Sequence, residues 1–170
     1  IGNGQKVMVE FVSANPTGPL HMGNARGGAL GDCIAGVLEA AGYDVTREFY
    51  INDAGNQIEK FGASLEARYI QLIKGEDAIE FPEDGYHGED IIEHAKAYIE
   101  LYGDSLLNED SEIRRKKLAE YAVQKNISSI KQVLESYGIV YDVWFSEKSL
   151  YENGELEDTL KYLKDNGYTE

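Results

Sequence analysis

Residues 15–27, NPTGPLHMGNARG, constrain the fold of this chain more than any other stretch. They follow an apolar run, KVMVEFV at residues 6–12, which predicts a buried β-strand. Pro16 and Pro19 end that strand, because proline has no N–H to donate to a neighbouring strand. A helical spacing of apolar residues begins at about Met22. The sequence therefore predicts a strand, a stiff loop and a helix in direct succession.

The predicted helix is followed by a second strand. Gly42 stands where a helix C-cap is expected, and DVTREFYI at residues 44–51 is typical of a strand. A strand–helix–strand unit of this kind has parallel strands. We expect the helix to pack through the apolar face formed by Leu30, Ile34, Val37, Leu38 and Ala41.

The rest of the chain is expected to be mostly helical, with one further strand. Helices are predicted at about residues 58–74, 91–102, 111–137 and 156–163, with a third strand in IVYDVWFSE at residues 139–147. We therefore expect an α/β fold with parallel strands in three parts. These parts are a first βαβ half of a nucleotide-binding core at 1–60, a helical insertion at 61–138, and a return strand and helix at 139–170.

Charge and composition exclude several classes. Sixteen basic and 31 acidic residues give a net charge of −15, which argues against a main nucleic-acid surface on this chain. Its one cysteine excludes an intrachain disulfide and a four-cysteine zinc site. No signal peptide or run of 18 apolar residues is present, so we expect a cytoplasmic protein without membrane contact. The chain begins without Met, so we interpret it as a piece of a longer protein.

The loop before the first helix has the properties of an anion site. Ligands of open parallel sheets bind beyond the carboxyl ends of the strands, where this loop is expected. The first N–H groups of a helix are unpaired and its dipole is positive at that end. His21 could donate a hydrogen bond to an anion there, although a histidine in a loop is more often structural.

HMGN at residues 21–24 resembles the HIGH signature of class I aminoacyl-tRNA synthetases. Three longer stretches resemble arginyl-tRNA synthetases in particular: residues 9–32, 42–62 and 141–152. The resemblance implies the first half of a Rossmann-like, HIGH-type nucleotide-binding fold. It also implies an arginine–tRNA ligase that forms arginyl-adenylate from arginine and ATP and transfers the arginine to tRNA(Arg).

The same resemblance implies roles for individual residues. His21 and Asn24 are expected to contact the ATP phosphates and to be catalytic, and Gly23 to lie under the adenine. Asn24 stands where the signature has its second histidine, so it can donate hydrogen bonds but carries no charge. The other expected contacts are Pro16 and Thr17 for ATP, and Glu10, Ser13 and Asn15 for arginine.

The implied cofactor and partners follow from the family. ATP with Mg²⁺ is expected as a substrate, with no tightly bound cofactor and no metal-binding residues. The intact enzyme is expected to be a monomer. No KMSK-like loop is present, so we expect the piece alone to be inactive; RRKKLAE at residues 114–120 is interpreted as a solvated helix face.

Three alternatives remain open at this stage. The chain could be a nucleotidyltransferase, which shares a similar histidine loop, or a non-catalytic binding module descended from a synthetase. His87 and His94 are seven residues apart and could in principle bind a metal, but glycines at 85 and 88 interrupt a shared helix.

Overall fold

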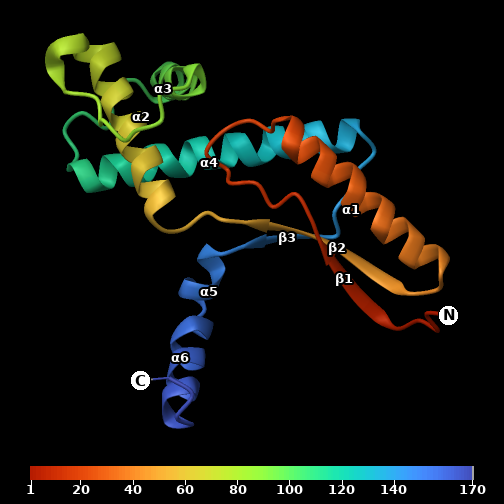
Figure 1. Ribbon diagram of the computed structural model, residues 1–170. Coiled ribbons are helices and arrows are strands. Elements are labelled where there is room, and N and C mark those ends of the chain that lie inside the picture. Colours follow the sequence, from red (N-terminus) through yellow and green to blue (C-terminus); the bar gives the residue numbers. More distant parts are fainter. Residues whose placement is uncertain (170) are drawn as a thin grey trace. The chain divides into compact units, whose positions relative to one another are not determined.

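The structure is a computed structural model, and it describes residues 1–169 (Figure 1). Three parallel strands form one sheet in the order β1-β2-β3. This arrangement confirms the expected α/β class with parallel strands. The strands are β1 (Lys6–Glu10), β2 (Asp44–Ile51) and β3 (Val143–Ser146). The helices are α1 (Met22–Ala40), α2 (Asn56–Lys74), η1 (Glu76–Ala78), α3 (Glu89–Tyr102), α4 (Ser111–Ser136), α5 (Lys148–Glu152) and α6 (Glu155–Asp165).

The chain forms two compact units. The sheet unit contains Ile1–Asn15, Leu20–Asp53 and the residues from Leu134 onward. The helical unit contains Ala54–Val133 together with the short loop piece Pro16–Pro19. The assignment of functions to residues 1–60, 61–138 and 139–170 stays a prediction.

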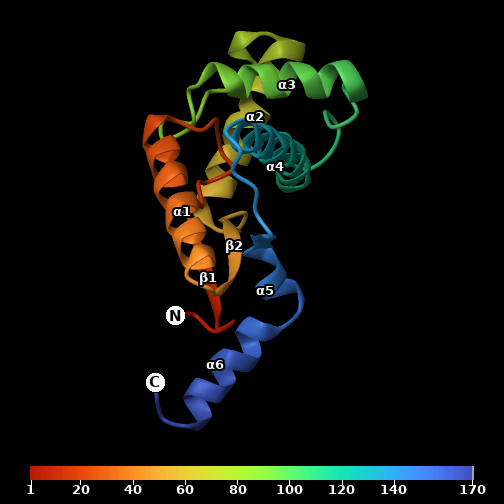
Figure 2. The same cartoon turned by 90° about the vertical axis from the view of Figure 1, so that its right-hand side faces the viewer.

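In the sheet unit, α1 covers one face of the sheet (Figure 2). Arg47 of β2 marks this face, because its side chain reaches Asp32 and Glu39 on α1. Phe49 lies on the same face and stacks on Trp144 of β3, with ring centroids 4.5 Å apart. Alternate residues of β1 and β2, among them Glu10 and its register partner Glu48, therefore point to the opposite face.

The prediction that α1 packs through its apolar face is wrong. Leu30, Ile34 and Val37 are exposed, and the buried residues of α1 are Gly28, Gly31 and Ala35. A helix packs closely against a sheet when small residues face it, and here the aromatic ring of Phe11 fills the space above Gly31. The expectation that the first strand is buried is also wrong, since Met8 is 58% exposed.

A methyl group on Gly31 should destabilise the sheet unit strongly. An ideal Cβ at this position would lie 2.2 Å from Cγ of the Phe11 ring, and the ring is buried and cannot move aside freely. We expect Gly31→Ala to lower the free energy of unfolding by about 1–3 kcal/mol, measured by urea denaturation of the chain. Gly27→Ala is the matched control, because nothing lies within 4 Å of its Cβ. Alanine there should stabilise α1 by about 0.5–1 kcal/mol, and equal losses in both variants would contradict the packing argument.

The helical unit is held together around a buried carboxylate. Glu66 of α2 is 2% exposed, and it accepts hydrogen bonds from Ser111 Oγ at 2.9 Å and Arg115 Nε at 2.5 Å at the start of α4. Arg114 Nε lies 3.6 Å from the same carboxylate. The interpretation of residues 114–120 as a solvated face is therefore wrong for Arg114, whose side chain is only 11% exposed, because a buried charge needs charged partners. Arg115 also pairs with Glu66, but its side chain is exposed, as expected.

The ends of several elements differ from the prediction. β1 stops at Glu10 rather than at residue 12, because the backbone turns sharply at Val12. β3 is shorter than predicted and begins only at Val143. Before it, the Tyr141 hydroxyl donates to the Phe11 carbonyl, just beyond β1, and the Asp142 carboxylate accepts the Arg47 N–H of β2. The short helix α5 was not expected from the sequence. The second strand matches its predicted range, 44–51.

Candidate functional site

The first turn of α1 carries three of the predicted site residues. His21 is the N-cap of the helix, and its Nδ1 accepts a hydrogen bond from the Gly23 N–H at 3.1 Å. In return, Oδ1 of Asn24 accepts the His21 N–H at 2.9 Å. The two side chains thus form a reciprocal capping box, which satisfies two backbone donors that would otherwise be unpaired.

The capping box orients the remaining donors of both side chains. A neutral histidine that accepts at Nδ1 carries its proton at Nε2, so the ring has one N–H left to donate. An amide that accepts at Oδ1 likewise keeps its NH₂ group for donation. Because His21 is exposed, Gly23 is exposed and the first turn of α1 has no acidic residue, an approaching anion meets donors and a positive helix end.

Gly23 makes room for this arrangement. An ideal Cβ at position 23 would lie 2.9 Å from Cε1 of His21, so a side chain there would push the imidazole away. Glycine at this position therefore belongs to the geometry of the capping box, whatever ligand approaches it.

The three residues predicted to bind arginine lie at the end of β1. Glu10 is the last residue of the strand and is exposed, and its carboxylate makes no hydrogen bond or ion pair with another residue within 1–169. Asn15 is also exposed. The Ser13 hydroxyl oxygen accepts the Tyr50 N–H of β2 at 3.1 Å. The Ser13 side chain thus connects the segment after β1 to β2.

The backbone between Glu10 and Asn15 is strained. The Ser13 N–H donates to the Phe11 carbonyl at 3.0 Å, which closes a three-residue turn centred on Val12. Val12 has a φ of 67° and Ser13 a φ of 41°, both in the left-handed region. A β-branched residue in that region costs roughly 1–3 kcal/mol and persists only where neighbouring contacts enforce it. We call residues 11–13 the Phe11–Ser13 turn.

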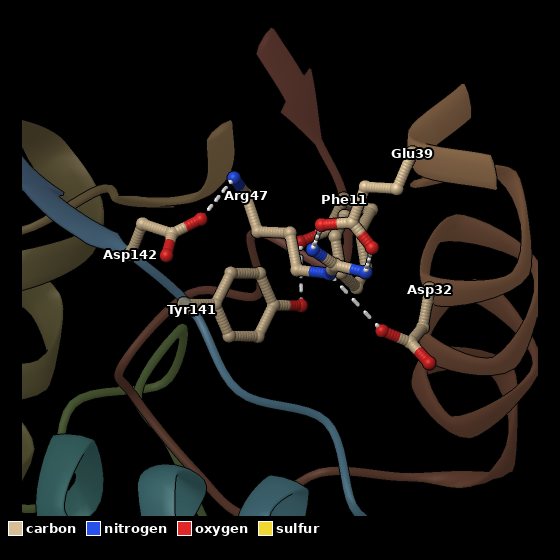
Figure 3. A network of polar contacts seen from close by, with 6 residues as sticks. All are labelled: Phe11, Asp32, Glu39, Arg47, Tyr141 and Asp142. Carbon is tan, nitrogen blue, oxygen red and sulfur yellow. Dashed lines mark hydrogen bonds and ion pairs between the residues drawn. The ribbon is translucent and has the colours of Figure 1, made fainter. Parts of the chain in front are cut away.

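Tyr141 supplies one of those contacts (Figure 3). Its hydroxyl donates to the Phe11 carbonyl at 3.0 Å, and the two rings lie 4.6 Å apart between centroids. Burial, assisted by the charge of Asp32, raises the pKa of the Tyr141 hydroxyl well above its usual value. The hydroxyl therefore stays protonated and remains a donor across the physiological pH range.

Arg47 connects the sheet to α1 and to the segment before β3. Its guanidinium donates to both carboxylate oxygens of Glu39, at 2.6 and 3.1 Å, and to Asp32 at 3.2 Å, and its backbone N–H donates to Asp142 at 2.7 Å (Figure 3). The hydrogen bond from Arg47 lowers the pKa of the Glu39 carboxyl. This network fixes the helix against β2 through a bidentate pair.

Asp53 makes a similar connection at the carboxyl ends of β2 and β3. Its carboxylate accepts from Ser146 Oγ at 2.6 Å and from the Lys148 N–H at 2.9 Å. The sequence analysis did not predict a role for Tyr141, Arg47 or Asp53. Each lies in a stretch that resembles the family, but pairing between distant residues has no signature in one sequence.

The other two predicted ATP contacts, Pro16 and Thr17, belong to the helical unit and are buried. The Pro16 carbonyl accepts from the Asn126 side chain at 2.9 Å, and Oδ1 of Asn126 lies 2.9 Å from Nε2 of His94. His94 thus has a partner in Asn126, and His87 packs on Phe81. Within residues 1–169, no group of three or more histidine, cysteine, aspartate or glutamate side chains could bind a metal ion.

The parallel sheet, with α1 directly after its first strand, defines an open α/β domain, a class in which ligands bind beyond the carboxyl ends of the strands. The family model for tRNA synthetases class I (R), catalytic domain, matches residues 1–170. The chain therefore belongs to this family of class I tRNA synthetases, the branch marked R for arginine.

The curated relatives agree with this assignment. The chain is 79% identical over 169 residues to the arginine–tRNA ligase of Acetivibrio thermocellus. The alignment covers 99% of this chain and 30% of that protein. It is 72% identical over the same length to the arginine–tRNA ligase of Ruminiclostridium cellulolyticum, again covering 30% of the relative. The chain thus spans about a third of the length of the relatives it matches.

Solved structures are similar in the same region. A structure described as an arginyl-tRNA synthetase from Campylobacter jejuni has a TM-score of 0.81 and 40% identity, with 96% of this chain and 35% of that chain covered. Arginyl-tRNA synthetase from Thermus thermophilus has a TM-score of 0.62 at 24% identity, with 96% of this chain and 27% of that chain covered, and it supports the fold alone. Among the described residues, no helix is both long and apolar enough to cross a membrane.

Proposed function

We propose that this chain is the first part of the catalytic core of an arginine–tRNA ligase. The full-length enzyme activates arginine with ATP and then transfers the arginyl group to the terminal ribose of tRNA(Arg). The observation that carries this proposal is the capping box, which engages Nδ1 of His21 and Oδ1 of Asn24 and so leaves the Nε2–H and the amide NH₂ to donate at the N-terminus of α1. These donors suit a polyphosphate.

In the proposed first step, a carboxylate oxygen of arginine attacks the α-phosphorus of ATP. The bond between that phosphorus and the bridging oxygen breaks, and pyrophosphate leaves with the electron pair. The enzyme needs only to align the two substrates and to stabilise the charge that develops on the phosphoryl oxygens. His21 and Asn24 donate to these oxygens, while Gly23 lets the adenine approach the backbone.

The site of arginine follows from the same proposal. Glu10 receives the guanidinium through two parallel hydrogen bonds, and Asn15 contributes a further polar contact. Pro16 and Thr17 complete the ATP site in the intact enzyme. Mg²⁺ accompanies ATP as part of the substrate, no cofactor is tightly bound, and the enzyme acts as a cytoplasmic monomer.

A hybrid enzyme tests the proposal. This chain replaces the matching 169 residues of the Acetivibrio thermocellus ligase, which is 79% identical to it over that length. We call this protein the hybrid ligase. We expect it to charge tRNA(Arg) with radiolabelled arginine, and to charge no other amino acid at a comparable rate. A hybrid ligase that folds but leaves tRNA(Arg) uncharged would refute the proposed function.

The isolated chain should be inactive by the same assay. A three-stranded sheet with one group of phosphate donors can bind one side of a triphosphate, but in-line transfer requires donors on both sides of the reacting phosphorus. We expect no arginine- and tRNA-dependent exchange between ATP and pyrophosphate from the 170-residue chain. Exchange at the rate of the hybrid ligase would contradict this expectation.

A further inference from the structure

The Phe11–Ser13 turn separates the two residues proposed to bind arginine. Glu10 precedes it and Asn15 follows it. If β1 continued as an extended strand, five residues would carry Asn15 about 16 Å beyond Glu10. The sharp turn prevents this extension, so the spacing between Glu10 and Asn15 depends on how firmly the turn is maintained.

The centre of the turn is Val12, and not a glycine, which would adopt a positive φ without strain. Val12 occupies the left-handed region, which L side chains rarely adopt, and the following Ser13 does the same. Local preference therefore opposes the turn, and the contacts around it must enforce it.

Two hydroxyl groups supply specific contacts of this kind. The Phe11 carbonyl accepts the Tyr141 hydroxyl at 3.0 Å (Figure 3). It also accepts the Ser13 N–H at 3.0 Å, so both of its lone pairs are occupied. On the far side of the turn, the Ser13 hydroxyl oxygen accepts the Tyr50 N–H at 3.1 Å. Tyr141 and Tyr50 come from different segments of the sheet unit, so the turn is fixed at both ends.

We propose that Tyr141 and Ser13 are positioning residues for the amino-acid substrate, because they maintain the turn that sets the spacing between Glu10 and Asn15. This inference rests on the proposed function, and it assigns to the Ser13 hydroxyl a role through the backbone in place of direct arginine contact. Arginine recognition then depends on a hydrogen bond from Tyr141, which lies far from Glu10 in the sequence.

The test is the variant Tyr141→Phe in the hybrid ligase. Phenylalanine keeps the ring that packs on Phe11 and removes the donor to its carbonyl. We expect the KM for arginine to rise about tenfold, the effect of losing one buried hydrogen bond, while kcat and the KM for ATP change less than about threefold. Tyr137→Phe is the control, because Tyr137 is 75% exposed and should leave all three values unchanged.

A second substitution separates positioning from general destabilisation. Glycine adopts a positive φ freely, so Val12→Gly should stabilise the turn without help from Tyr141. In the Tyr141→Phe background it should return the KM for arginine to within about threefold of the wild-type value. A merely structural defect would become worse when a further side chain is removed.

The outcomes are distinct. An unchanged KM for arginine in Tyr141→Phe, an equal rise in the KM for ATP, or a further rise on adding Val12→Gly overturns the inference. If Tyr141→Phe does not fold, Ser13→Ala is measured in its place with the same expected selectivity for arginine over ATP. If the unsubstituted hybrid ligase does not charge tRNA(Arg), the proposed function fails, and this inference fails with it.

Discussion

Replacing His21 by alanine in the hybrid ligase should lower kcat for arginyl-adenylate formation by roughly 100-fold or more. The Nε2–H is oriented by the capping bond at Nδ1, so it needs little reorganisation when charge develops on the phosphoryl oxygens. Its loss should affect the transition state more than the bound substrates, so the KM for arginine should change little. Pre-steady-state measurement gives the rate constant of adenylate formation separately from substrate binding and product release.

The capping role of His21 requires its own control. Alanine removes both the donor and the N-cap, and loss of an N-cap alone costs about 1 kcal/mol of stability. Asparagine is among the best N-cap residues, yet its amide is too short to reach where Nε2 lies. We expect His21→Asn to keep the melting temperature of the hybrid ligase and to lose as much activity as His21→Ala. Near-normal activity of His21→Asn would assign His21 to helix capping alone.

Removing the charge of Glu10 should lower kcat/KM for arginine by a factor of similar size. Glu10→Gln keeps the shape of the side chain and loses the bidentate, charge-assisted pair with a guanidinium. We expect kcat/KM for arginine to fall roughly 30- to 900-fold, which corresponds to a loss of about 2–4 kcal/mol of binding free energy. The affinity for ATP should stay the same. Citrulline, a neutral near-isostere of arginine, should lose its relative disadvantage as an inhibitor. Unchanged arginine kinetics would show that Glu10 is a solvated residue at a strand end.

Glu48 provides a matched control for this substitution. It lies beside Glu10 in the parallel register and points to the same face of the sheet. The two neighbouring carboxylates repel each other, and a nearby cation relieves this repulsion. Each carboxylate would therefore attract a cation even without a specific hydrogen-bond geometry. We expect Glu48→Gln to change kcat/KM for arginine less than fivefold, because a bidentate pair depends on one position and on its geometry. Equal effects of the two substitutions would indicate general electrostatic attraction instead.

The order and type of the main elements could be predicted from the sequence, because hydrophobic periodicity reports them directly. The strand–loop–helix–strand order and the range of β2 agree with the structure. The packing face of α1 could not be predicted in this way. Periodicity marks Leu30, Ile34 and Val37, but the distance between helix and sheet is set by the side chains that project from the sheet. Phe11 leaves room only for glycine at position 31.

The residues of the candidate site stay a prediction, and their geometry could be predicted only in part. His21, Gly23 and Asn24 follow from one motif, and the structure gathers them in one helical turn. The hydrogen bonds within that turn depend on local backbone geometry, which the motif does not specify. The turn at Val12 carries no sequence signal, because valine is typical of extended strands and its positive φ is imposed by Tyr141 and Tyr50 from distant segments.

The order of the strands along the chain also has a consequence for biosynthesis. β2 ends at Ile51 and its partner β3 begins at Val143, with most of the helical unit between them. At a ribosomal rate of about 5–20 residues per second, roughly 5–20 s pass before the third strand emerges. During this interval the edge of β2 is unpaired, whereas the contacts between α2 and α3 are local enough to form at once. The nascent helical unit can therefore fold while the sheet is still incomplete, and the exposed strand edge is the place where a nascent chain of this kind is open to aggregation or to a chaperone.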